Sequence, residues 1–99
     1  MYKMLMFLKI ANDQNVLNHF KNFTLPILNE LSGENIKAAR VESSLLIEQK
    51  YSWFCEAVVD SKNEWDRLMT MKEGKKFVKD LTDFHKSVDL IFVNYDEEL

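Results

Sequence analysis

The chain has few residues that impose a covalent or conformational constraint: its 99 residues include one cysteine, one proline and two glycines. The single thiol, Cys55, excludes an internal disulfide and fits a reducing compartment. We expect it to be a small buried apolar residue, because its local sequence lacks the cationic setting that activates a thiol. No repeat, linker or low-complexity segment is visible, so we expect one domain over residues 1–99.

An excess of positive charge is also missing. Thirteen lysines and arginines face sixteen acidic residues, for a net charge of −3, so we expect no nucleic-acid partner. The N-terminal apolar run Met4–Leu8 stops at Lys9, too short for a membrane span or a signal-peptide core. We therefore expect no membrane partner and a cytoplasmic location. Metal-binding and phosphate-loop motifs are absent, so we expect no metal and no cofactor.

Hydrophobic residues, in contrast, are abundant. They make up 46% of the chain and include seven phenylalanines, two tryptophans and five methionines. A small domain hides only part of its apolar surface in its own core, and a partner chain is the usual cover for the rest. The composition therefore indicates a homodimer.

Alternating and helical patterns predict the elements. Period-two patterns predict strands at Tyr2–Ile10, Trp53–Asp60 and Val88–Tyr95, and Asn35–Gln49 reads as a long, polar edge strand. A first helix follows the cap-type residues at 12–15, with apolar residues at helical spacing up to Leu31.

Each predicted helix carries an interruption. Pro26 removes a backbone donor from the first helix, so we expect a kink or restart near Thr24, and Gly33 provides a C-terminal stop. The second helix opens with the capping box Ser61-x-x-Glu64. We expect Gly74 to break it, after which the apolar stripe resumes at residues 77–84.

The predicted order is β-α-β-β-α-β, the ferredoxin-like α+β fold with a four-stranded antiparallel sheet. The first and last strands are apolar on both faces and lie side by side in this topology. Helices cover only one face of such a sheet, so we expect the open face to pair with a second copy of the chain.

Two segments carry a resemblance to a known family. The first segment is Leu25-Pro26-Ile27-Leu28 followed by Leu31-Ser32-Gly33. The second is Met71-Lys72-Glu73-Gly74 followed by the apolar residues up to Phe84. Both resemble the EthD-like group of the dimeric α+β barrel superfamily. The resemblance implies a homodimer with a small pocket between helices and sheet. Relatives act as cofactor-free monooxygenases, lactone isomerases, polyketide cyclases or haem-degrading enzymes.

The sequence departs from this family at a position that matters for chemistry. The group's helix histidine corresponds to Thr24, whose hydroxyl can orient a ligand but cannot act as a base near neutral pH. Haem degradation is not expected, because the first strand lacks an asparagine and Phe77 or Val78 stands where a histidine should fall.

The remaining candidates are few. His19 is a candidate base, against the simpler interpretation of a half-solvated helix flank. Thr24, Trp53, Trp65 and His85 are candidate ligand-binding residues, against core packing for Trp65, a dimer contact for Trp53 and a helix-end role for His85. The basic cluster Lys72, Lys75, Lys76 and Lys79 is interpreted as a solvated helix face balanced by Glu73 and Asp80.

Two functions remain open. The first is an EthD-like protein with a small-molecule pocket, acting as a monooxygenase, isomerase or cyclase on an aromatic or polyketide-like compound. The alternative is a non-catalytic dimeric binding or accessory module, which the threonine at position 24 favours.

Overall fold

A computed structural model describes residues 1–10 and 14–99 and shows helices and strands in the predicted order. The elements are β1 (Tyr2–Lys9), α1 (Gln14–His19), η1 (Phe20–Thr24), α2 (Leu25–Ser32), β2 (Ala39–Arg40), β3 (Tyr51–Val59), α3 (Lys62–Met69), α4 (Lys72–Phe84) and β4 (Val88–Asn94). The sheet order is β2-β3-β1-β4, and every neighbouring pair is antiparallel. The predicted α+β ferredoxin-like fold is therefore confirmed.

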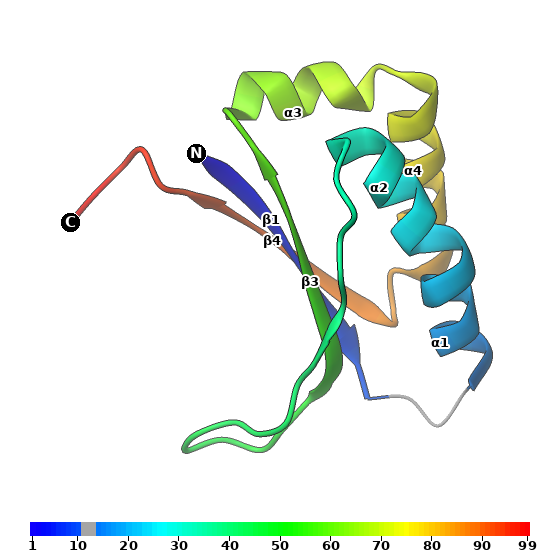
Figure 1. Ribbon diagram of the computed structural model, residues 1–99. Coiled ribbons are helices and arrows are strands. Elements are labelled where there is room, and N and C mark those ends of the chain that lie inside the picture. Colours follow the sequence, from blue (N-terminus) through cyan, green and yellow to red (C-terminus); the bar gives the residue numbers. More distant parts are fainter. Residues whose placement is uncertain (11–13) are drawn as a thin grey trace.

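All helices lie on one face of the sheet (Figure 1). On β1 the buried residues are Met4, Met6 and Leu8, which alternate along the strand and face the helices. Leu28 of α2 and Phe77 of α4 are fully buried against them. Burying a side chain of this size stabilises the fold by roughly 1.5–3 kcal/mol each, so this layer holds the helices in place.

No helix covers the other face of the sheet (Figure 1). Phe7 and Phe54 pack against one another across β1 and β3, with ring centroids 5.0 Å apart. Ile91 on β4 lies opposite Leu5 and is 49% exposed. Ion pairs flank this apolar centre: Lys3–Glu56 and Lys9–Asp89, each with N···O of 3.7 Å.

The first helical region runs from Gln14 to Ser32 without leaving helical geometry, but its middle is a π-helix. The Leu25 amide donates to the carbonyl of Phe20, five residues back. Pro26 lacks an amide and its ring crowds the preceding turn, which explains the wider turn just before it. The predicted irregularity near Thr24 is confirmed, and so is the Gly33 stop, which has φ of +70°. The expected cap residues Asn12 and Asp13 lie outside the described residues.

The break between α3 and α4 corrects one expectation. The helix ends at Met69 and restarts at Lys72, with Met71 extended, so Gly74 does not break it. Gly74 instead lies buried in the first turn of α4, where an added Cβ would stand 2.2 Å from the Leu68 carbonyl oxygen. Glycine is needed here because the two helices approach too closely for a side chain.

The segment between α2 and β3 also differs from the structure that the sequence predicted. Only Ala39 and Arg40 pair with β3, so the long strand predicted over 35–49 is wrong, although its edge position is right. Leu46 has φ of +74°, which a continuous strand does not allow. Leu45, Leu46 and Ile47 form an exposed apolar tip that projects beyond the sheet, away from the helices (Figure 1).

The strand ends shift by one or two residues from their predicted positions. Ile10 lies outside β1, β3 begins at Tyr51 rather than Trp53, and β4 ends at Asn94. Across the described ranges, no helix has the length and apolar character needed to cross a membrane.

Candidate functional site

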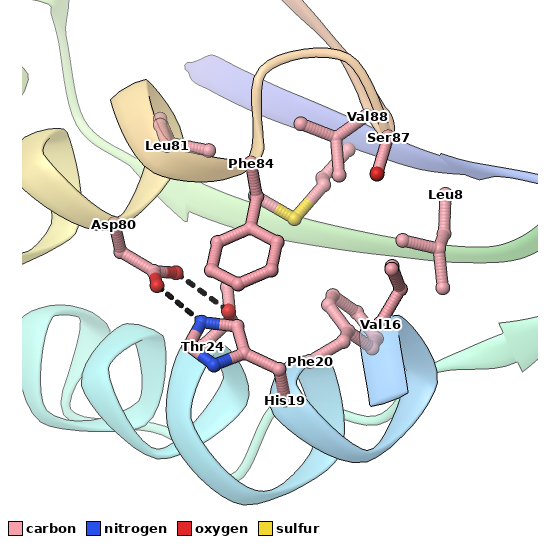
Figure 2. Close-up of a pocket in the computed structure, with 11 residues that line it drawn as sticks. Leu8, Val16, His19, Phe20, Thr24, Asp80, Leu81, Phe84, Ser87 and Val88 are labelled. Carbon is pink, nitrogen blue, oxygen red and sulfur yellow. Dashed lines mark hydrogen bonds and ion pairs between the residues drawn. The ribbon is translucent and has the colours of Figure 1, made fainter. Parts of the chain in front are cut away.

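A buried carboxylate on α4 connects the two helical regions. Asp80 is 5% exposed, and its Oδ2 accepts a hydrogen bond from the Thr24 hydroxyl at 2.6 Å. Its Oδ1 is in close contact with Nε2 of His19 (Figure 2). Both partners come from the first helical region, 56 and 61 residues away in sequence. A buried carboxylate needs such partners, because leaving it unpaired would cost several kcal/mol.

The His19 ring is held by aromatic contacts as well. It is stacked on Phe84 of α4, with centroids 3.9 Å apart, and on Phe23, at 5.1 Å. The imidazole is therefore fixed by its stacking on two aromatic rings and by the contact with Asp80. Its side chain remains 26% exposed, so solvent or a ligand can still reach it.

The π-helix explains why His19 and Thr24 meet the same carboxylate. These residues are five positions apart, a spacing that a regular α-helix would place on diverging faces. The wider π turn brings residues i and i+5 to one side of the helix. The local irregularity produced by Pro26 thus presents an imidazole and a hydroxyl together to α4.

This arrangement can support proton transfer. A carboxylate only accepts hydrogen bonds, so Asp80 favours the tautomer with hydrogen on Nε2 and leaves Nδ1 as the basic nitrogen. Figure 2 shows this second nitrogen turned away from Asp80. A carboxylate that orients an imidazole and stabilises its protonated form is a recurrent device in general acid/base catalysis.

The space at this site is small. A cavity of about 10 Å³ lies between helices and sheet, where the resemblance implied a pocket. That volume is at the lower limit for a single water molecule, so no organic ligand fits in this conformation. Its lining includes Met6, Leu8, Val16, His19, Phe20, Thr24, Asp80, Leu81, Phe84, Ser87 and Val88.

The structure brings together two of the predicted site residues, His19 and Thr24, and separates the others. Trp65 is buried in the core and makes edge contacts with Phe77 and Phe92, at centroid distances of 6.2 and 5.2 Å. Its ligand-binding role stays a prediction.

The other two predicted ligand-binding residues, Trp53 and His85, do not line the small cavity. Trp53 lines a separate groove of about 360 Å³ beside α1 and α2, and Phe20 is a wall common to that groove and the small cavity. His85 is exposed at the end of α4, where its Nδ1 is 2.9 Å from the Thr82 carbonyl oxygen. Their ligand-binding roles also stay predictions.

Asp80 is the residue that sequence reasoning missed. We interpreted it as a solvated partner of the lysines, whereas it is buried on the inner side of α4. The available signal was its spacing, three residues after Phe77 and four before Phe84, which places it on the apolar stripe. A carboxylate within such a stripe requires a buried partner.

Two other features limit the chemistry of the described residues. Burial, assisted by the nearby Glu56 charge, raises the pKa of the Cys55 thiol to about 12, so it is not a nucleophile near neutral pH. Within residues 1–10 and 14–99, no group of three or more histidine, cysteine or acidic side chains is placed to hold a metal ion.

Comparison with known proteins identifies structural relatives only. No family model and no curated protein sequence matches the chain. The fold is similar to that of an ethyl tert-butyl ether D (EthD) family protein from Bacillus halodurans C-125, with a TM-score of 0.78, 25% identity, and coverage of 100% of this chain and 99% of that one.

Two more distant structures share the fold. An Arabidopsis thaliana protein has a TM-score of 0.62 and 15% identity, over 100% of this chain and 97% of its own. An EthD-like protein from Ralstonia eutropha JMP134 has a TM-score of 0.61 and 12% identity, over 99% and 94%. The likeness to the Bacillus halodurans protein supports the resemblance to the EthD-like group that the motifs around Pro26 and Gly74 indicated.

Proposed function

We propose that this protein binds a small apolar or aromatic molecule and transfers a proton on it, with His19 as the acid/base group. The observation that carries this proposal is the buried Asp80, which contacts the imidazole and the Thr24 hydroxyl at once. Thr24 stands where the family resemblance implied a histidine, and His19 supplies an imidazole beside it. The missing histidine therefore does not remove acid/base chemistry from the site.

The step that best fits these groups is proton abstraction next to a carbonyl. Lactone isomerisation and polyketide cyclisation both need it, and a cofactor-free oxygenation also begins with a deprotonated substrate. His19 would take the proton on Nδ1, Asp80 would orient the ring and stabilise its charge, and the Thr24 hydroxyl would hold the carboxylate in place. The surrounding Phe84 and Phe20 rings would exclude water from the reacting atoms.

A non-catalytic binding module is the second candidate. The small volume of the cavity beside Asp80, about 10 Å³, favours it, because a working pocket needs several hundred Å³. In that case Asp80, His19 and Thr24 would tie α4 to the first helical region and do no chemistry.

Either function is proposed to operate in a homodimer formed through the open sheet face. Support comes from the uncovered apolar centre around Phe7, Phe54 and Ile91, and from the ion pairs at its margin. The exposed tip at 45–47 projects on the same side and would contact a second copy. An apolar patch bordered by charges is typical of a protein interface.

A hydrogen-exchange experiment tests the catalytic proposal. The protein is incubated in D2O with a panel of lactones, β-diketones and hydroxyquinones, and deuterium incorporation next to the carbonyl is followed by NMR. We expect faster exchange for at least one compound, and loss of that acceleration in His19→Gln. His85→Gln is the matched control, because this second histidine is exposed, is bonded to the Thr82 carbonyl and does not line the site. No acceleration over the whole panel, or equal acceleration by His19→Gln, would favour the non-catalytic module.

A further inference from the structure

A second and larger hollow lies on the outer surface of the helical layer. It has a volume of about 540 Å³ and is bounded by η1 and α2 on one side and by α4 on the other. His19 and Asp80 both belong to its wall. The partly exposed His19 ring is thus accessible from this groove as well as from the small cavity. Small-molecule sites commonly have volumes of this size.

The wall of this outer groove is partly aromatic. Phe23 and Phe84, the two rings stacked on His19, line it, and Pro26 and Ile27 add apolar surface. Phe23 is 48% exposed, so its ring offers apolar surface to a ligand in the groove. A flat apolar ligand lying here would contact the same rings that hold the imidazole.

Positive charge gathers at one margin of the groove. Lys76 and Lys79 line it and continue into a flat basic surface along α4, which we call the lysine stripe: Lys72, Lys75, Lys76 and Lys79. All four are exposed, and none forms an ion pair with another described residue. Lys72 and Lys75 lie in the first turn of α4, where the helix dipole disfavours cations.

Acidic side chains also lie near the groove and the lysine stripe. Glu30 and Asp83 also line the groove, whereas the Asp80 carboxylate is already satisfied by Thr24 and His19. Glu73 lies among the lysines on α4. With Asp80 included, four carboxylates lie near the four lysines, but lysines alone line the flat surface along α4, so the positive charge is concentrated at this margin. The local charge therefore favours an anionic group at this margin.

We propose that the groove and the lysine stripe form one binding site for a small aromatic molecule that carries a carboxylate or a phosphate. The aromatic part lies against Phe23 and Phe84 beside the His19 ring, and the anionic group contacts Lys76 and Lys79. This inference rests on the proposed function, because it names the class of substrate that His19 would act on. Binding itself, however, does not require that turnover occurs.

An NMR titration tests the site directly. Isotope-labelled protein is titrated with 2-naphthoate, 2-naphthyl phosphate and the uncharged 2-naphthamide, which share one ring system and differ in charge. We expect shifts in the amide signals of residues 22–30 and 76–84. We also expect both anions to bind roughly fivefold more tightly than the amide, as a few exposed charge contacts allow. The tighter of the two anions identifies the group that the stripe prefers.

A pair of double variants assigns the charge effect to the stripe. Lys76→Ala/Lys79→Ala should remove the preference for the anions while the amide binds as before. Lys37→Ala/Lys50→Ala makes the same change in charge at two exposed lysines outside the groove, and should keep the preference. If both double variants lost the preference for anions, the net charge of the protein alone would explain that preference, and the proposal would be overturned.

Other results overturn the inference independently of catalysis. Equal binding of anions and amide, shifts outside the groove, or no binding at millimolar ligand would each contradict it. Binding in the groove without any proton exchange would support this inference and contradict the proposed function.

Discussion

The coupling between Thr24 and Asp80 can be measured by replacing them separately and together. Thr24→Val keeps the side-chain volume and removes the donor of a 2.6 Å hydrogen bond to a carboxylate oxygen. A hydrogen bond to a charged group contributes about 1.5–3 kcal/mol, so the free energy of unfolding should fall by that amount. Asp80→Leu leaves the buried Thr24 hydroxyl without its acceptor, which costs about 1–3 kcal/mol.

The double variant Thr24→Val/Asp80→Leu tests whether the two side chains are energetically coupled. It leaves no unpaired buried group in this contact, and His19, 26% exposed, can be solvated by water. Its total cost should therefore be smaller than the sum of the single costs by about 1–2 kcal/mol. Urea unfolding at one fixed protein concentration gives all three values, provided that the m-value stays constant.

A matched control separates this contact from the general cost of losing a hydroxyl. Thr82 is exposed and its hydroxyl bonds the Val78 carbonyl of its own helix at 2.9 Å, so Thr82→Val should change stability by less than about 0.5 kcal/mol. Additive costs for Thr24 and Asp80, or a Thr24→Val cost as small as that of Thr82→Val, would refute a buried coupled pair.

Three further changes probe the fold and the assembly. Gly74→Ala should lower the free energy of unfolding in urea by about 1–3 kcal/mol, because the added Cβ would collide with backbone atoms. Gly33→Ala has free space around the added Cβ and should cost only about 1 kcal/mol, through the positive φ of this residue. Equal costs for the two variants would contradict this distinction. The Cys55 thiol, with its pKa raised to about 12 by burial, should react with iodoacetamide at pH 8 only after unfolding, as mass spectrometry would show; rapid labelling of the native protein would disprove its burial. Ile91→Lys places a charge on the open sheet face and should shift sedimentation at micromolar concentration from dimer to monomer, while Val78→Lys, equally exposed on α4, should not. A monomeric mass for the unmodified chain would refute the dimer itself.

The fold was largely predictable because its strongest signals are local. Period-two apolar residues identified β1, β3 and β4, and Pro26 indicated the position of the irregular turn. The position of the second break was not predictable in the same way. Gly74 resembles a helix breaker in sequence, but its role depends on how closely α3 and α4 approach, which is a tertiary property.

The site was only half predictable, since its central residue acts through distant partners. Thr24 and His19 were candidates by type and position, yet neither indicates which group it meets. Asp80 lies between Lys79 and Leu81, and its neighbouring lysines suggested a solvated charge. Only the packing of α4 against the first helical region shows that its partners are 56 and 61 residues away.

The π-helix at Phe20–Thr24 has a consequence for how this site tolerates insertions and deletions. A π turn accommodates about one residue more than an α turn, so η1 behaves as an inserted residue within an otherwise regular helix. Deleting one residue, such as Asn22, would let the chain return to α geometry and rotate His19 by about 100° relative to everything after the turn. The core residues of α2 could then keep their places while the imidazole left Asp80. The position of the imidazole over Asp80 therefore depends on the length of this turn as well as on which residues occupy it.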